Sequence, residues 1–243
     1  MKPFYLFILI SLLLISCNRP KKDTTKRLIV TSEKSIKNDD FSINKYLENP
    51  GAKISLPYYF SNKENTTTGT PLAGEINTII SQTGIGQTIS LDIRNSKDSV
   101  VFNQQIVPVA FGLCILGNYY LVFAQNEAGE SSDTYLFVMD RTGKITDHLK
   151  VKRTLGYFHD NKPLDLLQSA IDKNGTITTS EIVYPGDIYI DIFKKHSLQF
   201  NAYRLDKKYK INHQGMYNLI DSTSYPIREF TLKKISGVNI KDL

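Results

Sequence analysis

The segment Leu136–Thr146, LFVMDRTGKIT, decides the fold. Apolar residues run up to Asp140, and Ile145 resumes the apolar pattern two places past Gly143. An Asp at the first position of a turn accepts hydrogen bonds from the turn amides. A Gly three places later takes the positive φ that closes a type I turn with a bulge. The segment therefore predicts two antiparallel strands joined by a tight turn.

Two further segments repeat this plan, Gln168–Thr178 (QSAIDKNGTIT) and Ala202–Asn212 (AYRLDKKYKIN). In all three an Asp leads the turn, and these Asp residues lie 32 and 34 positions apart. Tyr209 stands where the third segment would need Gly, so the turn led by Asp206 must have a different form. Repeated hairpins of this kind predict an antiparallel meander.

Other segments add strands and one helix. Asn118–Ala124 (NYYLVFA) is apolar on both faces and predicts a strand buried on both, whereas Asp187–Phe193 (DIYIDIF) alternates. Leu91–Phe102 resembles a degenerate fourth hairpin. Leu72–Ser81 carries isoleucines at helical spacing and predicts one short helix. Because helical periods are nearly absent after residue 82, the sequence predicts an all-β body with at most one short helix.

Composition excludes several classes of protein. The 243 residues are 41% hydrophobic and 22% charged, which is typical of a globular body rather than a disordered chain. The two cysteines are too few for a disulfide scaffold or a cysteine-rich zinc module. A single long apolar run excludes a transporter with several membrane spans.

That apolar run lies at the amino terminus. Lys2 provides a basic start, and Phe4–Ile15 follows with Ser11 as its only residue that is not hydrophobic. Twelve residues in a helix reach roughly 18 Å, well short of the roughly 30 Å hydrocarbon core of a bilayer. The segment therefore fits the hydrophobic region of a secretory signal better than an uncleaved anchor helix.

The run ends in Leu14-Ile15-Ser16-Cys17, an aliphatic residue, a free position, a small residue and a cysteine. This tetrapeptide resembles the lipobox of bacterial lipoproteins. The resemblance implies cleavage after Ser16, a diacylglyceryl thioether on Cys17 and acylation of the new amino group, so that Cys17 anchors the chain to a membrane. The expected organisation is a signal peptide at 1–16, a basic tether and lead-in at 17–50, and a single all-β domain at 51–243.

The net charge of +6 is concentrated in the tether. Lys2 carries one positive charge in the signal, and residues 18–27 hold five basic residues against one Asp, which leaves the body from Leu28 onward near +1. A basic segment beside a lipid anchor is attracted to anionic headgroups by about 1 kcal/mol per basic residue, although a solvated linker would have the same composition. The near-neutral body argues against a nucleic-acid partner, and we expect none. Asn18, in place of Asp after the cysteine, implies delivery to the outer membrane by the sorting rule of Gram-negative lipoproteins. The basic tether lacks the acid-rich stretch that sends some lipoproteins to the cell surface, which favours the periplasmic face.

The hairpins at Asp140 and Asp172 also resemble the outer hairpins of β-propeller blades, as in propeller-type lipoproteins of Gram-negative envelopes. The resemblance covers about a third of the chain, and blades usually repeat at about 40–45 residues, longer than the spacing here. A propeller-like meander and a two-sheet sandwich are therefore both left open.

Motifs for cofactors and metals are missing from the sequence. No two histidines stand at the spacing that would point both imidazoles at one metal, and Gly84-Ile85-Gly86 lacks the third glycine of a dinucleotide fingerprint. We expect no cofactor and no metal. Cys114 lies in an apolar run, which predicts a buried and unreactive thiol.

The best surface constellation is Asp187, Tyr189 and Asp191, on one face of an alternating strand. The two carboxylates would lie roughly 13 Å apart, too far to act as a glycosidase pair, which needs about 5–9.5 Å. These residues are candidates for a ligand rim with Tyr189 as a stacking platform, although Asp on a solvated strand face is the commoner situation.

The expected function is a lipid-anchored binding module for a protein, peptide or glycan on the periplasmic face. It follows from an anchor motif attached to a body without a catalytic signature. Two alternatives are an envelope hydrolase whose site is assembled from separate strands, and a passive structural lipoprotein.

Overall fold

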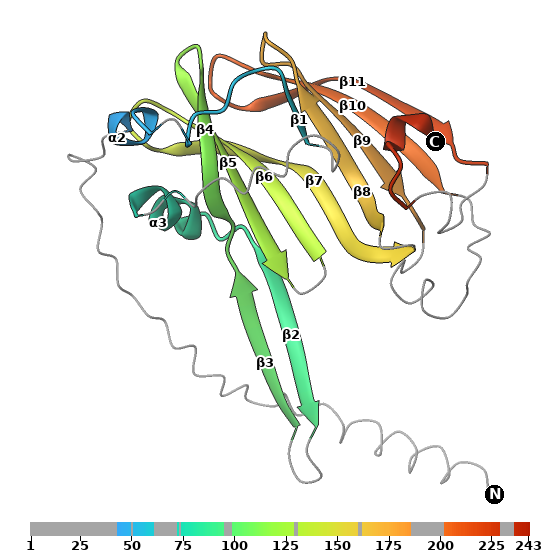
Figure 1. Ribbon diagram of the computed structural model, residues 1–243. Coiled ribbons are helices and arrows are strands. Elements are labelled where there is room, and N and C mark those ends of the chain that lie inside the picture. The colour runs from blue at the N-terminus through green and yellow to red at the C-terminus, as the bar shows by residue number, and fades with distance from the viewer. Residues whose placement is uncertain are drawn as a thin grey trace, which may run out of the picture. The chain divides into compact units, whose positions relative to one another are not determined.

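A computed structural model gives the fold (Figure 1). It describes residues 43–49, 51–60, 72, 74–94, 99–128, 131–159, 162–185, 202–228 and 236–243. All of them belong to one unit, Asn38–Leu243. The helices are α2 (Asn44–Leu47), α3 (Glu75–Gln82) and the 3-10 helix η2 (Ile240–Asp242). The strands are β1 (Tyr58–Phe60), β2 (Gln87–Arg94), β3 (Ser99–Ile106), β4 (Val109–Leu116), β5 (Tyr119–Ala128), β6 (Ser131–Met139), β7 (Ile145–His159), β8 (Lys162–Ile171), β9 (Ile177–Val183), β10 (Tyr203–Ile211) and β11 (Tyr217–Pro226).

The eight strands β4 to β11 form a meander in which each pairs antiparallel with the next along the chain. The short strand β1 joins this sheet beside β8, while β2 and β3 form a separate two-stranded sheet. The predicted all-β antiparallel meander is therefore confirmed, and so is the hairpin predicted near Leu91–Phe102. The meander is one continuous, open sheet rather than a set of separate blades.

The first two predicted turns have the expected chemistry. Oδ1 of Asp140 accepts the amide hydrogens of Thr142 and Lys144 at 2.8 and 3.0 Å, and Gly143 has φ of 86°. The turn led by Asp172 repeats this arrangement, with Gly175 at φ of 76°. Each turn is specified locally, because one carboxylate satisfies two amides and one glycine takes the left-handed conformation.

The third predicted turn was placed wrongly. Asp206 lies inside β10, paired with Ser180 on one side and Thr223 on the other. The turn begins six residues later, at Asn212, whose Oδ1 accepts the amides of Gln214 and Met216 at 2.9 and 3.0 Å. The side-chain amide oxygen of Asn does here what the Asp carboxylate does in the other two turns. Gly215, with φ of 75°, supplies the glycine missing at Tyr209.

Strand β7 bends the sheet. It has 15 residues and pairs with β6 through Thr154 and with β8 from Arg153 onward. The register shifts repeatedly on the β8 side, and Gly156 has φ of 104°. Such irregularities bend a strand. The strands before the bend, β4 to β6, and those after it, β8 to β11, are the two halves of the sheet. They consequently share one core, which consists of Phe60, Cys114, Leu121, Phe123, Leu136, Val138, Val151, Ile171 and Ile177, with Tyr209, Ile211 and Tyr217 packed against it.

Strand β5 is buried on both faces, as predicted. Leu121 and Phe123 face the shared core, whereas Tyr120 and Val122 face a second core covered by α2 and α3. The predicted short helix is α3, which buries Ile76 and Ile80 in that second core. No helix in the described part of the chain combines the length and apolar character needed to cross a bilayer.

The carboxyl-terminal segment packs on β8 and β9. Ile240 of η2 lies in a third core with Leu155, Leu164 and Ile182. The Gln168 side chain holds the segment, because its Oε1 accepts the amide hydrogen of Ile240 at 2.8 Å and its Nε2 donates to the carbonyl oxygen of Val238 at 3.3 Å.

Candidate ligand-binding groove

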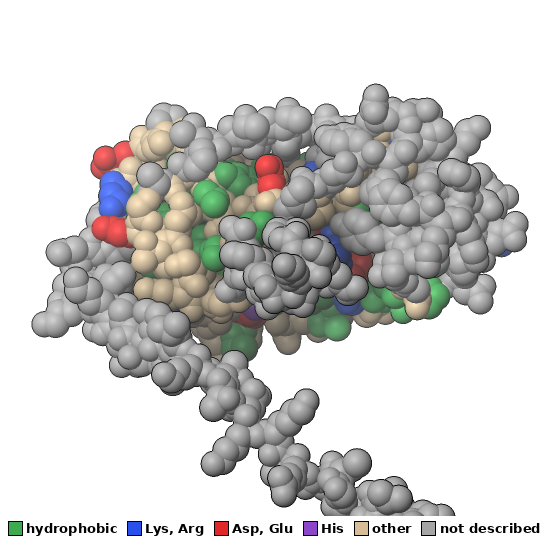
Figure 2. All heavy atoms as spheres, turned by 90° about the horizontal axis from the view of Figure 1, so that it is seen from below, with side chains coloured by type: hydrophobic (Ala, Val, Ile, Leu, Met, Phe, Trp, Pro, Cys, Tyr) green, Lys and Arg blue, Asp and Glu red, His purple; other side chains and the backbone are tan. Residues whose placement is uncertain are grey.

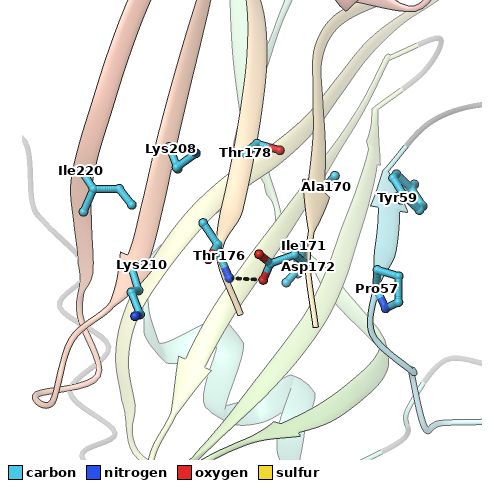
Figure 3. Close-up of a pocket in the computed structure, with 10 residues that line it drawn as sticks. All are labelled: Pro57, Tyr59, Ala170, Ile171, Asp172, Thr176, Thr178, Lys208, Lys210 and Ile220. Carbon is cyan, nitrogen blue, oxygen red and sulfur yellow. Dashed lines mark hydrogen bonds between the residues drawn. The ribbon is translucent and has the colours of Figure 1, made fainter. Parts of the chain in front are cut away.

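A groove of about 470 Å³ crosses the sheet from β1 to β11 (Figure 3). Ala170 contributes to its floor, and the next residue, Ile171, is buried in the shared core. Because successive side chains of a strand point to opposite faces, the groove lies on the face of the sheet turned away from that core. The lining residues are Pro57, Tyr59, Ala170, Ile171, Asp172, Thr176, Thr178, Lys208, Lys210 and Ile220.

Eight of the ten lining residues form two rows across the strands. Register places Ala170 opposite Tyr59 of β1 and opposite Thr178 of β9, and Thr178 opposite Lys208 of β10. A second row lies two residues further along, toward the turns, and contains Pro57, Asp172, Thr176 and Lys210. Figure 3 shows both rows running from β10 to β1.

The size of the side chains makes this face hollow. The middle of the first row is occupied by Ala170 and Thr178, which are small. Tyr59 stands at one edge with half its surface exposed, and Lys208 stands at the other. Small residues between large ones leave a trough on this face of the sheet.

A β-bulge completes the wall on the β11 side. Tyr209 pairs with Leu219 and Lys208 with Asp221, so Ile220 is the additional residue on β11. A bulge changes the direction in which the side chain of the additional residue points. Ile220 lines the groove and is 52% exposed. It gives the wall an exposed apolar patch beside the lysines.

Two cations of β10 are neutralised by carboxylates within the sheet. Arg204 lies 3.2 Å from Asp206, and Lys207 lies 3.8 Å from Glu181. Lys208 and Lys210 are both exposed, and neither has an ion-pair partner among the described residues. The unneutralised positive charge of this strand is therefore gathered in the groove.

Two acidic residues lie near these lysines. Asp172 lines the groove, but its Oδ1 accepts the amide hydrogens of Asn174 and Thr176, both at 2.8 Å. Asp221 lies across from Lys208 on the edge strand. On the face shown in Figure 2, the visible described side chains mix hydrophobic, basic and acidic types. The charged residues that line the groove are two lysines and one carboxylate, that of Asp172, so its lining has an excess of positive charge.

A buried polar cluster lies between β7 and β8, apart from the groove. Asp165 is 4% exposed and accepts hydrogen bonds from Thr154 Oγ1 at 2.7 Å and from Gln168 Nε2 at 2.9 Å. Burial lowers the pKa of nearby Lys152, while the Asp165 charge acts in the opposite direction. Since Gln168 also holds the carboxyl-terminal segment, the cluster has a structural role.

Cys114 is buried in the shared core, as predicted. Burial raises the pKa of its thiol to about 12, so the group stays protonated and unreactive at neutral pH. Within the described ranges, no three His, Cys, Asp or Glu side chains come together as metal ligands.

The residues singled out from the sequence, Cys17, Asp187, Tyr189 and Asp191, lie outside the described residues. The groove was not predicted, because its walls come from strands far apart in the chain. One local signal was present: Lys208 and Lys210 stand two apart on a strand and so share a face.

Comparison with known proteins does not classify the chain. No family model, no curated protein and no solved structure shows significant similarity to it.

Proposed function

We propose that this chain is a lipid-anchored binding protein of the cell envelope, which holds a ligand in the groove between β1 and β11. The observation that carries the proposal is the lining of the groove. It combines small floor residues, an exposed aromatic ring and two lysines that have no ion-pair partner among the described residues, in a volume of about 470 Å³. This volume is within the roughly 300–1,000 Å³ typical of ligand sites.

The sequence supports the membrane part of the proposal. The lipobox implies that Cys17 carries the lipid, and the basic tether suits a position beside anionic headgroups. One acyl chain anchors only marginally, whereas two or three anchor stably. The absence of Asp at position 18 favours the outer membrane, and a basic tether without an acid-rich stretch favours the periplasmic face.

Binding is tested by filling the groove. Ala170→Trp would place an indole on the floor, and Thr223→Trp would place one on exposed β11 outside the groove as a matched control. Full-length protein in detergent micelles is screened against an array of glycans and peptides. We expect ligands that bind the wild type and the Thr223→Trp variant but not the Ala170→Trp variant. No reproducible ligand, or a ligand unaffected by Ala170→Trp, would contradict the proposal.

Anchoring is tested separately by metabolic labelling with a palmitate analogue. We expect label on the wild type and none on Cys17→Ala. We also expect the body to resist added protease in intact cells and to be digested once the outer membrane is permeabilised. An unlabelled wild type would remove the anchor from the proposal, and digestion in intact cells would place the body at the cell surface.

A further inference from the structure

We infer that the groove selects an anionic oligosaccharide, with its acidic groups at Lys208 and Lys210 and a sugar ring against Tyr59. This inference rests on the proposed function and names the chemical class of its ligand. It is carried by three features of the groove: its charge, its floor and its aromatic rim.

The two groove lysines of β10 differ from the other basic residues of this strand in having no ion-pair partner among the described residues. The side chains of Arg204 and Lys207 already face Asp206 and Glu181. Lys208 and Lys210 stand two residues apart on one face, and a strand rises about 3.3 Å per residue, so their backbone positions are about 7 Å apart. Two flexible ammonium groups at this spacing suit successive acidic groups along an extended ligand.

The floor of the groove favours a ligand that is recognised by side chains. Strands β8, β9 and β10 each pair with a strand on both sides where they form the floor. Their backbone groups are therefore used in the sheet, and a peptide lying there cannot extend the hydrogen-bond ladder as it would at a free edge. Available polar groups are the hydroxyls of Thr176 and Thr178, which have no hydrogen-bond partner among the described residues.

The rim opposite the lysines is aromatic. Tyr59 is half exposed, and Pro57 continues the same edge in the second row. A tyrosine ring offers a rigid apolar face with a polar tip, and such rings are suited to contacts in which one side is apolar and the other wet. The C–H face of a sugar ring fits this surface, while its hydroxyls can reach the threonines.

The test uses full-length protein in neutral detergent micelles and three probes of matched length. They are oligogalacturonate, its neutral methyl ester and oligoglutamate. The lysine variant is Lys208→Gln with Lys210→Gln. Its control is Lys53→Gln with Lys144→Gln, which removes the same charge from exposed positions outside the groove. Tyr59→Ala removes the ring, and Tyr59→Phe keeps it.

We expect the affinity of the wild type for oligogalacturonate to be at least about tenfold higher than its affinity for the methyl ester. Hydrogen bonds to charged groups are stronger than those between neutral groups. The lysine variant should lose about tenfold in affinity while its control changes by less than about twofold. Tyr59→Ala should weaken binding, and Tyr59→Phe should preserve it.

Three outcomes would overturn the inference. Equal binding of the methyl ester would show that the groove does not recognise the negative charge of the ligand. Equal losses in the lysine variant and its control would show general attraction to a basic protein. Tighter binding of oligoglutamate without a Tyr59 effect would identify an acidic peptide as the ligand. If Ala170→Trp blocks an array ligand while oligogalacturonate fails, the proposed function stands and only its ligand class is wrong.

Discussion

The hydroxyl of Tyr217 donates a hydrogen bond of 3.0 Å to the backbone carbonyl oxygen of Leu136. Tyr217 begins β11 and Leu136 lies in β6, so this bond joins the two halves of the bent sheet. The backbone of Tyr217 is held as well, because its amide donates to Asp147 Oδ2 at 2.8 Å. Burial, followed by the charge of Asp147, raises the pKa of the Tyr217 hydroxyl well above its usual range.

Replacing Tyr217 with Phe should lower the free energy of unfolding by about 1–3 kcal/mol, because the carbonyl of Leu136 loses a buried donor. Urea unfolding followed by far-ultraviolet circular dichroism measures this change. Tyr209→Phe is the control, since no described group hydrogen-bonds to its hydroxyl. Equal effects of the two variants would mean that the bond between the halves contributes no stability.

Alkaline pH should destabilise the protein. The ordinary pKa of a Cys thiol is 9.0, and burial raises that of Cys114 to about 12. Between these values the unfolded chain releases the proton while the folded chain keeps it, so the free energy of unfolding falls as pH rises. The buried hydroxyl of Tyr217 acts in the same direction. Urea titrations from pH 8 to pH 11 should show a shallower fall for Cys114→Ala, and identical slopes would contradict this assignment.

The turn between β10 and β11 should tolerate substitution less well than the turn between β4 and β5. An added Cβ at Gly215 would lie 2.6 Å from the Tyr119 ring and 2.7 Å from Thr146 Oγ1. Gly117 also has positive φ, 58°, but nothing lies within 4 Å of its added Cβ. Gly117→Ala should therefore lower the free energy of unfolding only by the backbone penalty for a positive φ, about 1–2 kcal/mol.

Gly215→Ala should lower the free energy of unfolding by about 1–3 kcal/mol more than Gly117→Ala, because the side chains that contact the added methyl group must also move. The difference between the two midpoints in urea measures the crowding. If Gly117→Ala costs as much, the packing of this turn against Tyr119 is looser than the structure shows.

Removing the Gln168 side chain should release the carboxyl-terminal segment. Gln168→Ala leaves the amide of Ile240 and the carbonyl of Val238 without their partner, at a cost of about 1–3 kcal/mol. Hydrogen exchange measured by mass spectrometry should show faster exchange at 236–243. Gln214→Ala, in an exposed turn, is the control. Unchanged exchange in Gln168→Ala would mean that Ile240 packing alone holds the segment.

Local chemistry was sufficient to predict much of the framework. Asp140 and Asp172 each satisfy the amides of their own turns, so these turns could be located from a few neighbouring residues. A continuous apolar run likewise predicted that β5 is buried on both faces, and isoleucines at helical spacing predicted that α3 is helical. The tetrapeptide that resembles a lipobox and the basic tether are also features of the sequence, and the anchor that they imply stays a prediction.

The position of the third turn and the existence of the groove were decided by the tertiary structure, because both depend on contacts between residues far apart in the chain. Asp206 and Asn212 both resemble turn residues, and only pairing of Asp206 with two neighbouring strands shows that the turn is at Asn212. The groove needs Tyr59, Ala170 and Lys208 on one face. Their positions in the chain do not reveal this, since it depends on strand register and on the bulge at Ile220. A turn is made by its neighbours in sequence, whereas a binding surface is made by neighbours across the sheet.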